Sequence, residues 1–316
     1  SSFINWNTSS NGTGTQYCQY ETLTIVSSDL TLYAFYLPVE LYITGSNGFN
    51  NAVVWDRGSV SEKNNANYKK VFASGNDIYV AGSEWNSINS YWDGVYYKNG
   101  VELTRVSASN KSNYLNSIFF VNNNVYLCGN DGNNEGFIKE GVSTSLLGAN
   151  QIPVDIISDG IKKFSCGWGT YANFWLDSTP ENLDSNSGSK AYSLTNRGDD
   201  ILFTFTSGGK IFFCEAKYNL GTSYTYTYTV KDTTFTGVGT AITTKGNNIY
   251  IAGYDGTNAF YLISTNGGIN FSKTTLSGGA VATGLSFVND KLYIIGRSLF
   301  NENMSSTSLL WVEGRS

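Results

Sequence analysis

Histidine is absent from this 316-residue chain. Its absence excludes the Ser-His-Asp and Cys-His catalytic arrangements, together with every metal site that depends on imidazole. The side chain that most often moves protons near neutral pH is missing for the same reason. Any catalysis would have to use carboxylate, tyrosine, lysine or arginine side chains.

Charge is also scarce: charged residues make up 14% of the chain, and the net charge is −5. Lysine and arginine are scattered without a basic run, so the electrostatic signature of nucleic-acid binding is absent. No apolar run reaches the roughly 18 residues that a membrane helix needs. The sequence begins at SSFINWN without a signal peptide, which predicts a mature or trimmed chain.

Proline is rare, with three residues, whereas aromatic residues make up 15% of the chain and glycine occurs 34 times. Threonine, tyrosine, valine and isoleucine are abundant and favour strands. No window shows sustained helical periodicity. High aromatic content with low charge is typical of a folded chain, and we expect an all-β fold.

An apolar octapeptide that usually ends in glycine recurs along the chain. One copy is GNNIYIAG, which ends at Gly253, and another is GNDIYVAG, which ends at Gly82. The copies end at positions 45, 82, 129, 167, 215, 253 and 296, with Glu215 in the place of the glycine in the fifth. Their mean spacing of about 42 residues is typical of β-propeller blades.

Each repeat contains further strand-like runs around the octapeptide. Most copies are preceded by an apolar run such as NSIFFV and followed by an aromatic-rich run that ends at a turn glycine, such as VYYKNG at Gly100. The octapeptide itself is apolar on both faces, as expected for strands buried between stacked sheets. We therefore predict a seven-bladed β-propeller of four-stranded antiparallel blades over residues 18–316, with residues 1–17 as an N-terminal extension.

The ends of the chain predict how the ring closes. The last repeat stops near Gly314, before its fourth strand, while TLTIV at residues 22–26 precedes the first-strand run LTLYAFYL of the first repeat. We expect residues 22–26 to supply the outermost strand of the last blade, so that the N-terminal segment closes it; SSFINW is the weaker candidate. The recurring glycine predicts close backbone approach or a positive φ.

Three cysteines, Cys128, Cys166 and Cys214, occupy one slot of consecutive octapeptides. Stacked sheets lie about 10 Å apart, whereas a disulfide needs Cα atoms within roughly 7 Å. We expect these cysteines to be buried free thiols rather than a bridge or a metal site.

The connections that follow the octapeptides should gather on one rim of the ring, called here the B–C rim because they join the second and third strands of each blade. Aromatic rings beside amide and carboxylate groups on this rim suit a glycan or a protein partner. The alternative is that the aromatic residues pack on the core. The predicted ligand-binding residues are Glu84, Trp85, Trp92, Asp131, Trp168, Tyr171, Tyr254, Asp255 and Arg297.

The carboxylates of Glu84, Asp131 and Asp255 raise two further possibilities. A glycosidase needs two carboxyl groups about 5 to 10 Å apart, but nothing in the sequence marks these residues as catalytic. The stretch DGNNEG resembles the opening of a calcium loop, with Asp131, Asn133 and Glu135 as oxygen ligands. Val142 replaces the glutamate expected at the twelfth position, so an ordinary Asn/Gly turn is the alternative. No other cofactor is expected.

One stretch and the repeat as a whole carry family resemblances. STNGGINF, residues 264–271, resembles a degenerate Asp-box of sialidase-like propellers, with Asn266 in place of the aspartate and Phe271 in place of the tryptophan. This resemblance implies kinship of fold, since the arginine triad and Tyr–Glu pair of sialidases are not recognised. The repeat cadence over nearly the whole chain resembles the blade repeats of secreted or surface-anchored bacterial seven-bladed propeller proteins.

The function expected from the sequence is a non-enzymatic binding module outside the cell or at its surface. It would be a monomeric domain that recognises a glycan or a surface protein through the B–C rim. A lipid anchor on a removed N-terminal segment is one option for its attachment. Two alternatives are a carboxylate-based glycoside hydrolase or lyase, and an architectural propeller in an envelope assembly.

Overall fold

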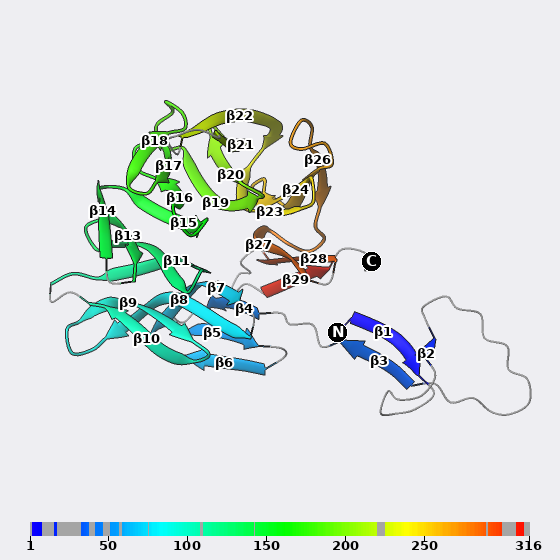
Figure 1. Cartoon of the computed structure of the whole chain (residues 1–316), viewed down its shortest axis with the longest axis horizontal. Coiled ribbons are helices and arrows are strands. Elements are labelled where there is room, and N and C mark those ends of the chain that lie inside the picture. The colour runs from blue at the N-terminus through cyan, green and yellow to red at the C-terminus, as the bar shows by residue number, and fades with distance from the viewer. Residues whose placement is uncertain are drawn as a thin grey trace, which may run out of the picture.

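The computed structural model describes residues 2–7, 16–17, 33–37, 42–46, 51–56, 59–74, 76–107, 110–141, 143–219, 225–288, 290–298 and 308–312. All regular secondary structure in these residues is β-strand (Figure 1). Within the same ranges, no helix has the length and apolar character to cross a membrane.

Seven antiparallel sheets follow one another along the chain and form the blades. Blade 1 contains β4 (Tyr42–Ser46), β5 (Ala52–Asp56) and β6 (Ser59–Lys63). Blade 2 contains β7 (Ala66–Ser74), β8 (Asp77–Asn86), β9 (Tyr91–Lys98) and β10 (Val101–Val106). Blade 3 contains β11 (Asn113–Val121), β12 (Asn124–Asp131), β13 (Glu135–Glu140) and β14 (Ser143–Ala149).

The remaining four blades repeat this up-and-down order. Blade 4 contains β15 (Ile152–Ser158), β16 (Lys163–Trp168), β17 (Ala172–Leu176) and β18 (Thr179–Asn182). Blade 5 contains β19 (Lys190–Arg197), β20 (Asp200–Ser207), β21 (Lys210–Asn219) and β22 (Thr225–Thr236). Blade 6 contains β23 (Val238–Lys245), β24 (Asn248–Tyr254), β25 (Ala259–Ser264) and β26 (Ser272–Thr275). Blade 7 contains β27 (Val281–Val288), β28 (Lys291–Arg297) and β29 (Ser308–Val312).

The blades are arranged around a common centre (Figure 1), and the first strands of blades 2 to 7, with β4 of blade 1, line one central cavity. This arrangement confirms the seven-bladed β-propeller predicted from the repeat. Aromatic side chains fill the space between neighbouring blades, as in the stacked pair of Phe174 on β17 and Phe203 on β20, whose ring centroids lie 5.0 Å apart. The apolar character of both faces of the inner strands is thereby explained.

In blades 2, 3, 4, 6 and 7 the recurring glycine lies beside a bulge in the neighbouring strand, whereas blade 5 has Phe205 beside its bulge. The first strand of each of blades 2 to 7 carries a β-bulge next to the glycine position. A Cβ atom on Gly167 would lie 2.0 Å from the carbonyl oxygen of Ile152, and one on Gly82 would lie 2.2 Å from that of Asn67. Close backbone approach is thus the reason for the glycine, and φ at these two residues is not positive.

Blade 5 departs from the predicted register. The copy that ends at Glu215 lies in β21, the third strand of its blade, and β20 occupies the second position. Phe205 pairs with Ala191 where the other blades place the glycine. Because β20 and β21 are both largely buried, their apolar patterns are alike and the octapeptide alone could not distinguish them.

The N-terminal strands form a separate sheet in the order β2-β1-β3, with β1 (Ser2–Asn7), β2 (Gln16–Tyr17) and β3 (Tyr33–Leu37). The last of these belongs to the run predicted as the first strand of blade 1, but it pairs with β1 and not with β4. A strand with an open edge can pair with any available partner, and β1 offers one. The predicted closing strand at residues 22–26 lies outside the described residues.

The three described cysteines are free and buried, as expected. Desolvation raises the pKa of Cys128 and of Cys166 well above the ordinary thiol value, and it also raises the pKa of Cys214. Cys214 lies in β21, so it occupies the third strand of its blade and does not share the slot of the other two.

Candidate functional site

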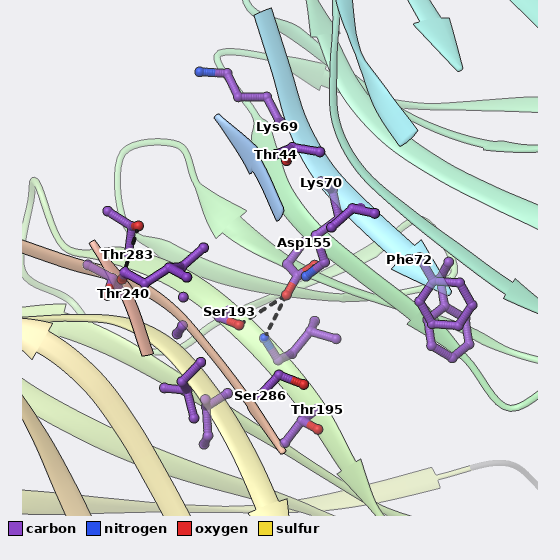
Figure 2. Close-up of a pocket in the computed structure, with 18 of the residues that line it drawn as sticks. Thr44, Lys69, Lys70, Phe72, Asp155, Ser193, Thr195, Thr240, Thr283 and Ser286 are labelled. Carbon is purple, nitrogen blue, oxygen red and sulfur yellow. Dashed lines mark hydrogen bonds and ion pairs between the residues drawn. The ribbon is translucent and has the colours of Figure 1, made fainter. Parts of the chain in front are cut away.

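The bulged first strands turn one residue each into the central channel. These residues are skipped by the strand register and line a cavity of about 1080 Å³. They are Lys69, Asn116, Val154, Tyr192, Thr240 and Thr283, from blades 2 to 7 in order. Figure 2 shows Lys69, Thr240 and Thr283 around this cavity. The bulge thus serves the channel as well as the backbone packing, because it places a polar side chain there in five of the six blades.

Asp155 on β15 anchors the channel wall. Its Oδ1 atom accepts hydrogen bonds from Lys70 Nζ at 3.0 Å and Ser117 Oγ at 2.7 Å. Its Oδ2 atom accepts from Ser193 Oγ and the Leu194 backbone N–H, both at 3.1 Å (Figure 2). The Asp155 side chain is 4% exposed, whereas that of Lys70 keeps 38% of its surface open to the channel. Both carboxylate oxygens are therefore satisfied within the protein.

Among the described residues that line the channel, Lys69 is the charged side chain without a partner. It has no hydrogen-bond or ion-pair partner among the residues that the structure describes. Water reaches its side chain, yet the surrounding protein desolvates the ammonium group and lowers its pKa. The other charged lining residues, Lys70 and Asp155, neutralise one another. The described lining therefore carries one uncompensated positive charge.

An aromatic cluster stands at the mouth of the channel on the B–C rim. Trp168 and Tyr254 directly follow the glycine position of blades 4 and 6, and Arg297 follows that of blade 7. The Trp168 ring lies 6.1 Å from the ring of Tyr192 on β19, and Lys190 Nζ, on the same strand as Tyr192, lies 4.9 Å from the centroid of the Trp168 ring. We call Trp168, Tyr192 and Tyr254 the mouth aromatics. All three are half-buried.

The environment of Tyr192 ties this cluster to the channel. Its side chain lines the cavity from the bulge of β19, and desolvation, with a smaller electrostatic contribution from Tyr254, raises the pKa of its hydroxyl group. The Tyr192 hydroxyl is therefore protonated at neutral pH and available as a hydrogen-bond donor.

Asp131 and Asp255 play a shared structural role. Each lies two residues beyond the glycine position and begins an Asp-Gly turn between the second and third strands. The carboxylate of Asp255 accepts hydrogen bonds from the backbone N–H groups of Thr257 and Asn258 and from Lys273 Nζ at 2.6 Å. These bonds, that of Lys273 foremost, lower the pKa of Asp255 to about 2.

The Asp131 turn is built in the same way. Oδ1 of Asp131 accepts from the backbone N–H groups of Asn133 and Glu135, both at 2.9 Å, and Oδ2 accepts from Lys111 Nζ at 2.5 Å. The two oxygens that the calcium hypothesis requires are thus engaged by the turn and by a lysine. Among the described residues, no group of three or more carboxylate or cysteine side chains is gathered for a metal ion.

Glu84 is buried between blades 1 and 2 in a network of donors. Its Oε1 atom accepts from the hydroxyl groups of Tyr97 at 2.5 Å and Tyr68 at 2.8 Å, and its Oε2 atom accepts from Arg105 Nη2 at 2.9 Å. The pKa of Glu84 stays below its usual value because these hydrogen bonds outweigh the opposing effect of desolvation, which is the largest single contribution. Glu84 is therefore an ionised structural anchor.

The predicted site residues thus separate into groups. Trp168, Tyr254 and Arg297 lie on the B–C rim at the ends of β16, β24 and β28, while Glu84, Asp131 and Asp255 hold turns and blades together. On the rim of blade 2, Trp85 is 41% exposed and meets Trp92 edge to face, with ring centroids 5.9 Å apart. Tyr171 is half-buried in the turn of blade 4, where its carbonyl accepts a hydrogen bond from Gly169.

Sequence reasoning missed the channel residues Lys69, Asn116 and Tyr192. A signal for them was present: each lies 13 residues before the glycine position of its blade. That spacing becomes informative once the bulge is known, because a regular strand would turn this position toward a neighbouring blade.

The Asp-box-like stretch forms a turn in blade 6. It joins β25 to β26 at the hairpin of the third and fourth strands of blade 6. Ser264 Oγ donates to Asn266 Oδ1 at 2.8 Å, and Asn266 Oδ1 accepts from the backbone N–H of Asn270. Phe271 packs against Phe213 of blade 5 with ring centroids 5.8 Å apart. The motif therefore stabilises a turn.

Comparison with known proteins yields similarity of fold. No protein-family model matches the chain, and no curated protein matches it in sequence. Among solved structures, it resembles YCF48 from Cyanidioschyzon merolae, with a TM-score of 0.50 and 13% identity over 87% of this chain and 96% of that one. It also aligns with the computationally designed Ika8 protein, with a TM-score of 0.46 and 12% identity over 88% and 95% of the respective chains. At these identities, the similarity to YCF48 supports the propeller fold alone.

Proposed function

We propose that this protein is a non-enzymatic binding module that holds a glycan at the channel mouth on the B–C rim. The observation that carries the proposal is the set of mouth aromatics, Trp168, Tyr192 and Tyr254, beside a cavity lined with hydrogen-bonding side chains. Aromatic faces stack on the apolar faces of sugar rings, while convergent polar groups fix the orientation of the hydroxyl groups.

The shape of the site favours a glycan over a protein partner. Ligand pockets for small molecules enclose about 300 to 1,000 Å³, and the channel is of that size. A protein that inserts one side chain into the channel is the competing outcome of the experiment below.

The chemistry of the channel favours an acidic glycan. Lys69 supplies an ammonium group without a described partner, and Tyr192 supplies a hydroxyl donor from the same register position of blade 5. The carboxylate of Asp155, the one acidic side chain of the described lining, is already neutralised by Lys70. A sugar carboxylate or sulfate would complement this lining.

The protonation of the three rim carboxylates argues against a glycoside hydrolase. A general acid must hold its proton near neutral pH, which requires a raised pKa. The pKa values of Glu84, Asp131 and Asp255 are instead lowered by the donors that surround each one, although burial opposes the shift. A glycan-binding role also agrees with the extracellular or cell-surface location expected from the sequence, which remains part of the proposal.

A glycan array that contains neutral and acidic glycans tests the function. We expect the wild-type protein to bind the acidic glycans of the array. Trp168→Ala should weaken this binding at least tenfold. Lys69→Gln should weaken the binding of acidic glycans more than the binding of neutral ones. Ile88→Ala serves as the matched control, because Ile88 lies on the same rim and is 91% exposed, away from the channel lining. Binding that survives Trp168→Ala but is lost in Trp85→Ala would move the site to blade 2.

Two further outcomes would contradict the proposal. Release of free sugar from a bound glycan would show that the protein is an enzyme. Absence of glycan binding together with the binding of a purified surface protein, lost in Trp168→Ala, would assign the mouth to a protein partner.

A further inference from the structure

The hairpin of β8 and β9 extends farther beyond the B–C rim than its counterparts in blades 3 to 6. In those blades the second and third strands remain paired for one or two residues past the glycine position. In blade 2 the pairing continues for four residues past Gly82, as far as Asn86. Because a strand rises about 3.3 Å per residue, the end of this hairpin stands roughly 7 to 10 Å farther out.

The end of this hairpin, residues 85–92, is called here the blade 2 tip. Its sequence, WNSINSYW, contains no aspartate, glutamate, lysine or arginine. Ile88 in the turn is 91% exposed. Trp85, which is 41% exposed, pairs with Trp92, and the half-buried Tyr91 precedes Trp92. The turn that carries the exposed isoleucine is therefore followed by strand residues that carry three aromatic rings.

The turn holds Ile88 in a fixed position. Oδ1 of Asn86 accepts hydrogen bonds from the backbone N–H groups of Ile88 at 3.0 Å and Asn89 at 3.4 Å. The carbonyl oxygen of Asn86 accepts from the backbone N–H of Ser90 at 2.8 Å. These bonds engage backbone donors that would otherwise need water, so they lower the cost of removing the turn from water.

The charged residues next to the tip on β8 and β9 are buried at its base. Glu84 pairs with Asp93, directly below the pair of Trp85 and Trp92. Arg105 donates to Glu84 Oε2 at 2.9 Å and to Asp93 Oδ2 at 3.3 Å. The two carboxylate side chains are 7% and 0% exposed. An apolar phase would therefore receive the tip without taking up an exposed charge.

We infer that the blade 2 tip inserts into the surface of a lipid bilayer and that the acidic glycan held on the same rim is the head group of a membrane glycolipid. Tryptophan and tyrosine rings are enriched where lipid head groups meet acyl chains, and an aliphatic side chain such as that of Ile88 favours the acyl region. Trp168 lies on the same rim, so a bilayer that receives the tip faces the glycan site. The choice of a glycolipid rests on the proposed function, whereas insertion of the tip does not.

The small size of the tip explains why both contacts are needed. Burial of one isoleucine side chain strengthens binding by roughly one to two orders of magnitude. Stable attachment to a membrane usually requires two such signals. The tip and the glycan site supply them from one rim, so each contact raises the effective concentration of the other.

Vesicle binding by matched variants tests the inference. Phosphatidylcholine vesicles carry a sialylated or a sulfated glycosphingolipid, and the corresponding free oligosaccharides are measured beside them. We expect Ile88→Ser to weaken binding to the recognised glycolipid roughly tenfold or more and to leave binding of its free oligosaccharide unchanged. Ile161→Ser is the control, because Ile161 is 66% exposed in the connection of β15 to β16 on the opposite rim.

A dye at the tip gives a readout that needs no glycan. In a Cys18→Ser background, Ile88→Cys is labelled with a fluorophore, and Ile161→Cys is labelled in the same way as the control. The three described cysteines are buried, so the label is confined to the new thiol. With plain phosphatidylcholine vesicles whose acyl chains are brominated, we expect quenching of the dye at position 88 at high lipid concentration and none at position 161.

Two results would overturn different parts of the inference. A dye at position 88 that stays unquenched on plain and glycolipid vesicles, with Ile88→Ser binding as the wild type does, would refute insertion and leave glycan binding standing. Quenching at position 88 without binding of any acidic glycan, free or on lipid, would uphold insertion and refute the glycolipid together with the proposed function.

Discussion

Asp155 on β15 accepts a hydrogen bond from Lys70 on β7 at 3.0 Å, although these strands belong to blades 4 and 2. The contact passes the intervening strand β11, whose Ser117 donates to the same oxygen. With Ser193 of β19 on the second oxygen, one carboxylate connects the inner strands of four successive blades. The polypeptide chain links each blade only to the next one. The Asp155 network therefore adds noncovalent contacts between blades 2 to 5 at the centre of the ring.

The first prediction concerns this network. Asp155→Asn keeps the size of the side chain but removes its charge and turns an NH2 group toward donors. We expect the free energy of unfolding to fall by about 2 to 4 kcal/mol, because the charge of Lys70 loses its partner at a partly buried position. The loss is limited because part of the Lys70 side chain still reaches channel water. Urea unfolding followed by tryptophan fluorescence measures the change. Asp290→Asn, at a side chain that is 91% exposed, should change it by less than about 0.5 kcal/mol.

The second prediction concerns the recurring glycine. Gly167→Ala should lower the free energy of unfolding by about 2 kcal/mol or more, since the new methyl group would lie 2.0 Å from the Ile152 carbonyl oxygen and 2.8 Å from the Pro153 Cα atom. Both contacts are backbone atoms, which cannot move aside as a flexible side chain could. Ser143→Ala, at an exposed position of β14, is the control. Equal stability of the two variants would contradict the steric account of the repeat.

The third prediction follows from the Asp255 turn. The pKa of Asp255 is depressed to about 2 from the usual 3.8, chiefly by the hydrogen bond from Lys273. The stabilisation is therefore complete above pH 4 and is lost as the pH falls toward 2. Wild type should exceed Asp255→Asn by roughly 1 to 2 kcal/mol at neutral pH, with the gap closing below pH 4. A stability difference that stays constant down to pH 2.5, measured by urea unfolding, would contradict this.

Lys273→Gln is the companion test of the same pair. Without the ammonium group, the carboxyl pKa should rise toward its ordinary value, so Asp255→Asn should cost less in this background. The coupling of the two changes is read from the double-mutant cycle.

The fourth prediction concerns thiol reactivity. Cys128, Cys166 and Cys214 are buried, and desolvation raises the pKa of each. Because the thiolate is the reactive form, a Cys18→Ser variant should react with an aromatic disulfide reagent only after unfolding in guanidinium chloride. Fast labelling of the native protein near pH 8 would show that the space between blades is open.

The propeller was predictable because its signal is periodic. The copies that end at Gly82 and Gly253 both form the second strand of a blade and are buried between neighbouring blades. The same packing requirement therefore favours the same residue types in each copy. Register within a blade was less predictable, as Phe205 and Glu215 show: two neighbouring strands are buried on both faces and carry similar apolar runs. The pairing of Tyr33–Leu37 with β1 was not predictable, since one edge-forming strand can bind several partners.

The candidate site was predictable only in outline. Trp168 and Tyr254 were identifiable because they directly follow the repeated octapeptide. Lys69 and Tyr192 were missed because a bulge decides that they face the channel, and their spacing of 13 residues before the glycine position has meaning only once the bulge is known. The carboxylates of Asp131 and Asp255 lie at the connections between second and third strands, as predicted, but sequence alone could not show that turns and lysines engage them.

The most direct test of the proposed binding site is 19F NMR of the protein labelled with 5-fluorotryptophan, titrated with the strongest acidic glycan from the array. We predict that the resonance of Trp168 shifts with saturation, while that of Trp175, fully buried in blade 4, stays in place. Single Trp→Phe variants assign the signals. Saturable shifts confined to Trp85 and Trp92, with Trp168 unmoved, would contradict the assignment of the channel mouth as the binding site.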